Sequence, residues 1–246
     1  MTNNTGKNNG EVQIIPDKYR ILNGSWLKLI AVVTMLIDHV ASVLLRDCGI
    51  TLISIAGRSL SLYQAMRYVG RLAFPIYAFL LIEGFLHTSD RKKYGINLFV
   101  FALISEIPWN LEHSGGLLYS EQNIFFTLFL GYMAICVVER FRGKKQVGYL
   151  LMLLLITILI RADYGCAGFG FIILLYVLRD HKLLRAVIGS CILPSNWIAG
   201  LAFVPISLYN GKRGFIRGKF MKYAFYAFYP AHLLVLFLIK FSLGGY

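Results

Sequence analysis

The sequence predicts an all-α polytopic membrane protein, a bundle of about nine transmembrane helices with its N-terminus in the cytoplasm. Three observations indicate this class: of the 246 residues 57% are hydrophobic, only 15% are charged, and the mean hydropathy is +0.63. Soluble domains carry about a quarter charged residues, so this composition is typical of a chain that lies in lipid. The net charge of +13 would suggest nucleic acid for a soluble protein, but membrane proteins gather Lys and Arg in cytoplasmic loops. We therefore expect the lipid bilayer, and no nucleic acid, as a partner.

Nine apolar stretches are long enough, or nearly long enough, to cross a bilayer, which takes about 20 helical residues. Several are shorter than that, so one or two of them are candidates for helices buried in the bundle or re-entrant segments. The sixth and seventh are the most doubtful. In chain order the stretches are 26–45, 69–86, 96–109, 124–138, 147–160, 168–178, 183–193, 197–209 and 223–241.

The basic residues predict the orientation of these stretches. Of the 25 Lys and Arg, 19 lie in the N-terminal segment and in the connections that follow even-numbered stretches, against six elsewhere. Because Lys and Arg concentrate on the cytoplasmic side, we expect the N-terminus inside, the C-terminus outside and a multi-pass protein of the plasma (inner) membrane. Residues 1–24 are polar and Asn-rich, which predicts a disordered cytoplasmic tail before a single transmembrane domain at 25–246.

Lys28 and His39 lie eleven residues apart in the first stretch. Eleven steps of about 100° end about 20° past three full turns, so both side chains project from one helix face, about 16 Å apart along the axis. Asp38 adjoins His39, and an ionisable pair in a spanning segment costs several kcal/mol unless it faces a partner or a polar cavity. Neighbouring helical residues diverge, so the partner of Asp38 must come from another helix, and Arg71 or Arg161 is the natural choice.

Further polar residues fall at the same predicted depth as Asp38 and His39, near the outer leaflet. A common depth is what a shared polar cavity requires, although proximity to the lipid headgroups would also tolerate polar residues there. His39 is the best candidate for chemistry, because imidazole takes and returns a proton near pH 7. Alternatively, Asp38 belongs to a structural ion pair and His39 donates to a carbonyl. The further cavity candidates are Arg71, Glu106, Asn110, Asn123, Thr127, Arg161, Asp163 and Tyr164.

Other features are weaker. His232 follows Pro230 in the last stretch, where it either lines the cavity or packs between helices. His113 lies at a loop edge and is expected to be solvated, and the four cysteines lack metal-ligand spacing, so we expect no metal site. The basic turn at 209–214 is suited to a phosphate, although the positive-inside rule alone would also explain its charge.

Eight blocks of the sequence, in order over about residues 26–240, resemble those of the TraX family, whose named member acetylates the N-terminus of F-type conjugative pilin. The blocks are MLIDHV at 35–40, GRLAFPIYAFLLIEG at 70–84, Thr88 with Tyr94, SEIPWN at 105–110, NIFFTLFLG at 123–131, DYGCAG at 163–168, YNGKRG at 209–214 and YAFYPAH at 226–232. The spacing of Lys28 and His39 also resembles the basic-x10-His signature of the membrane acyltransferase-3 family. The FP pair of the second block is similar to that of the lysosomal heparan-glucosaminide N-acetyltransferases.

The resemblance implies a transmembrane acyltransferase that moves an acetyl group from cytoplasmic acetyl-CoA to an extracytoplasmic acceptor. The acceptor stays open: a pilin-like peptide, a glycan or a small-molecule amine or hydroxyl. His39 would act as general base or as a transient acyl carrier beside Asp38, and Arg71 or Asn123 would polarise the thioester carbonyl. The donor's phosphates would be held by Lys28, Tyr209, Asn210, Lys212 and Arg213.

A secondary transporter is the alternative from another class, since transporters also use buried Asp, His and Arg beside discontinuous helices. The odd number of predicted helices and the lack of visible repeats argue against it. A purely structural membrane protein is a third interpretation, which the buried ionisable residues disfavour.

Overall fold

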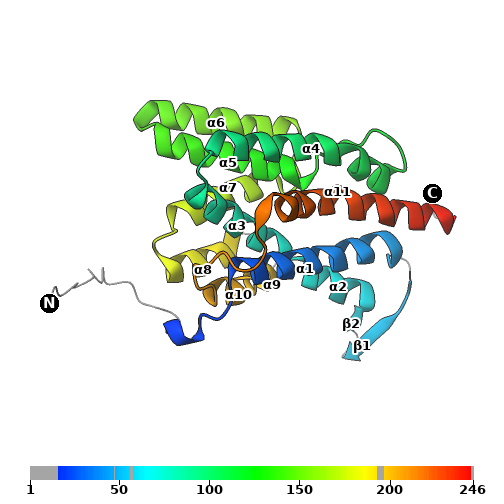
Figure 1. Ribbon diagram of the computed structural model, residues 1–246. Coiled ribbons are helices and arrows are strands. Elements are labelled where there is room, and N and C mark those ends of the chain that lie inside the picture. Colours follow the sequence, from blue (N-terminus) through cyan, green and yellow to red (C-terminus); the bar gives the residue numbers. More distant parts are fainter. Residues whose placement is uncertain (1–15, 47, 56–57, 193–196, 245–246) are drawn as a thin grey trace.

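The computed structural model describes residues 16–46, 48–55, 58–192 and 197–244, and most of them are helical (Figure 1). This confirms the predicted all-α class, with one addition, a small two-stranded sheet. The elements are η1 (Asp17–Tyr19), α1 (Gly24–Leu44), β1 (Thr51–Ile55), β2 (Arg58–Ser61), α2 (Leu62–Gly70), α3 (Ala73–His87), α4 (Arg91–Ser114), α5 (Ile124–Arg140), α6 (Gly143–Leu159), α7 (Gly165–Val177), α8 (Lys182–Ile192), α9 (Trp197–Gly200), α10 (Phe203–Ser207) and α11 (Gly218–Ser242).

Every predicted apolar stretch is helical, but the nine crossings are not confirmed. Three helical segments in the described part of the chain are long and apolar enough to cross a membrane: Gly24–Leu44, Leu62–His87 and Gly218–Ser242. The second of these joins α2 to α3, and the predicted stretch 197–209 is divided into α9 and α10. The sequence analysis also missed the antiparallel pair of β1 and β2, in which Thr51 pairs with Ser61.

The helix α8 and the broken helix formed by α9 and α10 make a short pair at one end of the bundle. The 11 residues of α8 rise about 16 Å, roughly half of the 30 Å of a hydrocarbon core. The chain enters this pair through the connection after α7 and leaves it at 208–217, and both connections lie at the same end (Figure 1). Helices of this length are shorter than a helix that crosses the hydrocarbon core, and such lengths are typical of re-entrant segments.

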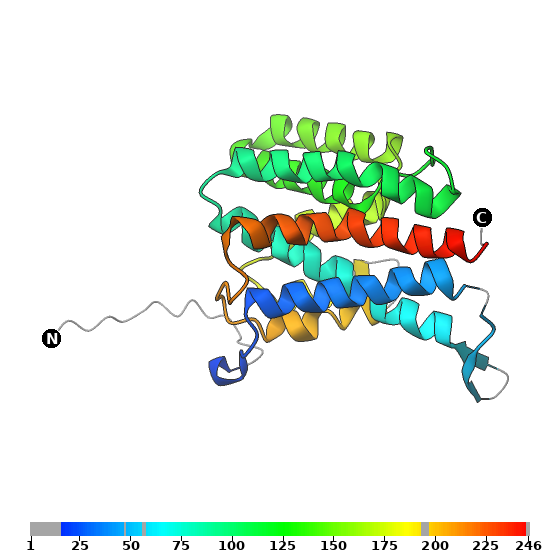
Figure 2. The same cartoon turned by 45° about the vertical axis from the view of Figure 1, so that its right-hand side comes forward.

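The segment before α1 and the four connections rich in Lys and Arg lie at one end of the bundle, which we call the basic end (Figures 1 and 2). It holds the segments 16–23, 88–90, 141–142, 178–181 and 208–217. The end of α11, the sheet and the connections at 115–123 and 160–164 lie at the opposite end. One end therefore collects the cations that a cytoplasmic face collects in membrane proteins.

The residues just before α1 are held against the basic turn. Leu22 forms a parallel bridge with Tyr209, and the Asn23 side chain caps α1 by accepting hydrogen bonds from the backbone N–H groups of Ser25 and Trp26. The tail predicted for residues 1–24 therefore ends earlier, because these backbone groups find partners in the turn and the helix cap. Residues 1–15 lie outside the described part of the chain.

Candidate functional site

A cavity of about 630 Å³ runs along α1 between α3 and α11. Lys28, Asp38 and His39 all line it, so the spacing on α1 does bring the cation and the imidazole to one face. Its volume lies in the range of small-molecule sites, which are mostly apolar with a few placed polar groups. We call this space the main cavity.

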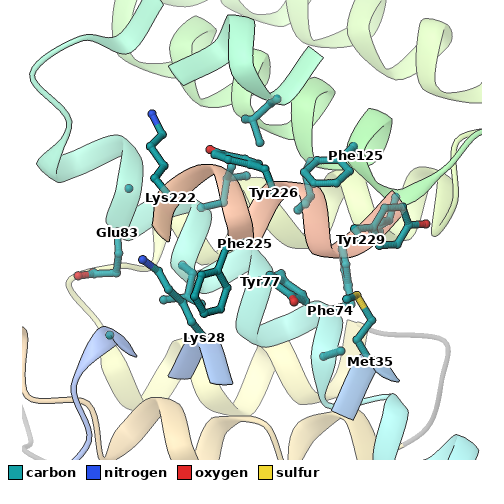
Figure 3. A pocket seen from close by; sticks show the side chains of 18 of the residues that line it. Lys28, Met35, Phe74, Tyr77, Glu83, Phe125, Lys222, Phe225, Tyr226 and Tyr229 are labelled. Carbon is teal, nitrogen blue, oxygen red and sulfur yellow. The ribbon is translucent and has the colours of Figure 1, made fainter. Parts of the chain in front are cut away.

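The part of the main cavity near the basic end carries positive charge. Lys28, Arg213 and Lys222 line it there, with the Glu83 carboxylate beside them. Figure 3 shows the amino groups of Lys28 and Lys222 on the same side of the cavity as Glu83. The Lys28 Nζ lies 6.0 Å from the centroid of the Phe225 ring. With three cations and one carboxylate, this end of the main cavity, which we call its mouth, favours the binding of an anion.

Aromatic side chains fill the middle of the main cavity. Tyr77, Phe225, Tyr226 and Phe125 lie between the lysines and the pair formed by Met35 and Tyr229 (Figure 3). Stacked and edge-on rings such as Phe125 on Tyr229, with centroids 5.4 Å apart, keep this wall rigid. Such a wall suits an extended, weakly polar chain and limits the entry of water.

His39 and His232 form a hydrogen-bonded pair at the far end of the main cavity. The Nδ1 of His232 lies 2.8 Å from the carbonyl oxygen of Phe228, and its Nε2 lies 3.0 Å from the Nδ1 of His39. A carbonyl only accepts, so the proton of neutral His232 sits on Nδ1 and its Nε2 accepts. The Nδ1 of His39 must then donate, and it is shared with the carbonyl of Met35 at 3.0 Å.

This pairing leaves the Nε2 of neutral His39 without a proton. Among the residues that the structure describes, no group hydrogen-bonds this nitrogen, and His39 lines the main cavity. His232 is 93% buried behind it, with 7% of its surface exposed, and is not part of the lining. The second histidine therefore fixes the tautomer of the first, as a hydrogen-bonded orienting group does in catalytic sites.

Asp38 pairs with Arg67 of α2, and the predicted pairing with Arg71 or Arg161 is wrong. The Arg67 guanidinium donates to the Asp38 carboxylate at 2.5 Å. Arg71 hydrogen-bonds the Tyr164 side chain instead, and Arg161 is exposed. The close approach of α1 and α2 depends on Gly70, since a Cβ there would lie 2.1 Å from the Asp38 Oδ1.

One ionisable residue near the histidine pair, Glu112, was missed by the sequence analysis. Glu112 is buried and pairs with His113, and it is close enough to Asp38 and His232 for electrostatic interaction. The His113 ring packs on Trp109, with centroids 3.7 Å apart, and the residue is exposed at the end of α4, as expected. The predicted stretch ended at 109 where the apolar run stops, whereas α4 continues to Ser114.

Asn123 lies outside the lining of the main cavity, because its carboxamide caps a helix. Its Oδ1 accepts from the Phe125 N–H at 3.1 Å, and its Nδ2 donates to the Ala102 carbonyl at 2.8 Å and to Glu106 at 2.7 Å. The side chain is fully buried. These bonds occupy both of its donor hydrogens, so Asn123 has none left for a thioester, and the structure places Glu106 with it outside the lining.

The remaining candidates at the opposite end divide into two groups. Asp163 and Tyr164 line the main cavity. Thr127 is fully buried and donates to the backbone carbonyl of Asp163, which holds the 160–164 connection on α5. Asn110 donates to the Leu117 carbonyl at 2.9 Å and braces the connection after α4. These two residues shape the end of the cavity from behind it.

The basic turn contributes two of its four candidates to the main cavity. Tyr209 and Arg213 line it, whereas Asn210 and Lys212 do not. The Asn210 side chain accepts from the Lys212 N–H at 2.9 Å and thereby closes the turn, and Lys212 itself is exposed. The hydroxyl of Ser25 donates to the Arg213 carbonyl at 3.2 Å, so the turn is tied to the start of α1 beside Lys28.

Asp163 predicts a pH dependence of stability. Burial raises the pKa of its carboxyl from the ordinary 3.8 to about 6, although the Tyr164 N–H, His113 and Arg71 act in the opposite direction. A raised pKa means that folding favours the protonated form, so its stabilising contribution is complete below about pH 4 and is lost as pH rises through 6. We expect Asp163→Asn to raise the melting temperature, relative to the unmodified protein, more at pH 7.5 than at pH 4.5.

Thermal unfolding of the detergent-solubilised protein, followed by intrinsic fluorescence from pH 4.5 to 7.5, measures the change in melting temperature that Asp163→Asn causes. Asp180→Asn is the matched control, because the Asp180 side chain is 78% exposed. An equal change for Asp163→Asn at both pH values would contradict the prediction.

Fold and site together define a class: a helical membrane protein whose internal cavity joins a cationic mouth to a buried histidine pair. Within that class the chain belongs to the TraX family, since the model described as TraX protein matches residues 23–240. A relative, the "Probable fimbrial assembly protein FimC, serogroup H1" of Dichelobacter nodosus, is 28% identical, and the match covers 85% of this chain and 92% of the relative. No solved structure matches the chain.

Proposed function

We propose that the protein is a transmembrane acyltransferase of the plasma membrane that transfers an acetyl group from acetyl-CoA to an acceptor amine. The observation that carries this proposal is that one continuous cavity joins the cations at the basic end to His39. With the basic end in the cytoplasm, the donor would enter where cytoplasmic acetyl-CoA is available and the acceptor from the other side.

The residues of the main cavity fit this donor. Lys28, Arg213 and Lys222 offer cations to its phosphates, and the aromatic wall matches its weakly polar arm. The helical rise from Lys28 to His39, about 16 Å, is comparable to an extended pantetheine arm. Acetyl-CoA would supply the acetyl group as an activated thioester, and the protein needs to supply binding, orientation and a base.

His39 is the proposed general base. Its Nε2 takes the proton of the acceptor amine as the amine nitrogen bonds to the acetyl carbon, and it returns that proton to the departing thiolate sulfur as the carbon–sulfur bond breaks. While His39 is charged, its Nδ1–H donates to the Nε2 of His232, which stabilises the imidazolium. When both His39 and His232 are neutral, the His39 Nε2 is free to accept the next proton.

We infer that the acceptor is the terminal amine of a pilin-type protein. The support is the TraX family membership and the name of the fimbrial assembly relative. The opposite end of the main cavity is also lined by Asp38 and Asp163, and polar acidic side chains there suit an incoming amine.

The test uses the purified protein, acetyl-CoA labelled in its acetyl group, and a synthetic pilin N-terminal peptide. We expect acetyl-CoA to raise the melting temperature and label to pass to the free peptide amine but not to a peptide whose terminus is already blocked. A donor that neither stabilises the protein nor passes label to the free peptide would overturn the proposal.

A further inference from the structure

We propose that a second, smaller cavity at the basic end binds the phosphate monoester of a nucleoside, and that it receives the 3′-phosphate of the acyl donor. This inference rests on the proposed function, which supplies the donor. The smaller cavity has a volume of about 180 Å³ and lies where the segment before α1, the start of α8 and the end of α10 meet. Its charged lining residues are Arg20, Glu83, Arg179, Lys182 and Arg185.

The two cavities adjoin each other. Glu83, Tyr209 and Gly211 line both of them, so a ligand that leaves the mouth of the main cavity passes Tyr209 to reach the smaller one. Burial raises the pKa of the Tyr209 hydroxyl above its usual value, and the hydroxyl therefore keeps its proton. A carboxylate and a phenol at the junction suit the neutral, hydroxyl-bearing ribose, whereas a phosphate at that point would be repelled by Glu83.

The smaller cavity carries four cations against one carboxylate. Arg20 comes from the segment before α1, Arg179 from the connection after α7, and Lys182 and Arg185 from the start of α8. The positive-inside rule explains why Lys and Arg occur in these segments, but it does not require them to converge on one concave site. Convergence of guanidinium groups is the arrangement that binds phosphate through paired hydrogen bonds.

Contacts with the protein hold these cations in place before any ligand arrives. The Arg185 side chain is buried, and its guanidinium lies 5.2 Å from the centroid of the Phe79 ring. Arg20 donates to the Tyr209 carbonyl at 2.8 Å. Arg179 lies 4.5 Å from the centroid of the Tyr176 ring. Side chains that are already ordered lose less entropy on binding than solvated ones, so they favour a specific site.

The two cavities divide the charge of the donor between them. Lys28, Arg213 and Lys222 in the main cavity face the position expected for a pyrophosphate at the head of the pantetheine arm. The smaller cavity lies beyond it and provides a separate set of cations for a second, isolated phosphate. A donor without the 3′-phosphate would keep the first set of contacts and lose the second.

The experiment compares the affinities of acetyl-CoA and acetyl-dephospho-CoA for the full-length protein by titration calorimetry. We expect the unmodified protein to prefer acetyl-CoA by about tenfold or more, the usual effect of one charge-assisted phosphate contact. Lys182→Gln should reduce this preference to near onefold and leave the affinity for acetyl-dephospho-CoA unchanged. Arg185→Lys keeps the charge over Phe79 and so should fold, but it loses the paired geometry and should reduce the preference part of the way.

Lys144→Gln is the matched control, since Lys144 is an exposed cation at the basic end and lines neither cavity. An unchanged preference in both Lys182→Gln and Arg185→Lys would overturn the inference. Binding of adenosine 3′,5′-bisphosphate, which carries the phosphates but no acetyl group, tests the phosphate site separately from the proposed acetyl transfer. If it binds the unmodified protein but not Lys182→Gln while acetyl-CoA is not a donor, the phosphate site stands and the transferase proposal fails.

Discussion

His39→Ala is expected to lower kcat for acetyl transfer by about 100- to 10,000-fold, the usual contribution of a positioned general base. The affinity for acetyl-CoA should change little, because the imidazole lies at the far end of the cavity from Lys28 and Arg213. An interaction made only in the transition state lowers kcat and kcat/KM together. Label transfer from acetyl-CoA to the pilin peptide, measured at saturating donor, gives kcat, and calorimetry gives donor affinity.

His181→Gln is the matched control, since His181 is an exposed imidazole outside both cavities. A well-folded His39→Ala protein that turns over at the normal rate would rule out His39 as the base.

His232→Phe tests the positioning role of the second histidine. It removes the acceptor for the His39 Nδ1–H, so kcat should fall by a smaller factor than in His39→Ala while KM stays constant. A purely structural role for His232 would instead lower the fraction of folded protein and leave kcat per folded molecule unchanged.

The alignment of Lys28 with His39 followed from sequence because helical periodicity needs no knowledge of neighbouring helices. The residues of other helices that contact Asp38 and His39 could not be predicted in this way. Arg67 lies on α2, a nine-residue helix that precedes the apolar run and was not recognised. Glu112 was missed because hydropathy ends a predicted segment where polar residues begin, whereas α4 continues to Ser114 and is capped by Gly115, which has φ 68°.

The candidate role of Asn123 shows a different limit. An Asn directly before an apolar run is a helix N-cap signature, and the structure uses Asn123 in that way. Polarity at a common depth could not distinguish a capping side chain from one that faces the cavity. The pairing of His39 with His232 joins residues 193 positions apart, and no local pattern reports such a contact.

The ion pair between Asp38 and Arg67 carries the largest expected effect on stability. Removing one partner of a poorly solvated pair leaves an uncompensated charge, which costs about 3 to 5 kcal/mol in buried sites. The two side chains are 17% and 24% exposed, and partial solvation reduces that cost. We therefore expect Arg67→Gln to lower the free energy of unfolding by about 2 kcal/mol.

A double-mutant cycle isolates the pair. Asp38→Asn in the Arg67→Gln background should restore part of the lost stability, because the charge left unpaired is then removed as well. Arg71→Gln is the comparison, since Arg71 bonds to Tyr164 and acts on Asp38 only through space, so its coupling to Asp38→Asn should be smaller than that of Arg67. Denaturant unfolding in mixed micelles provides the four free energies of each cycle. Because Asp38 adjoins His39 on α1, a coupling energy near zero for Asp38 and Arg67 would mean that α2 does not hold this turn of α1 in place, and the support for His39 would have to come from α3 and α11, which also pack on α1.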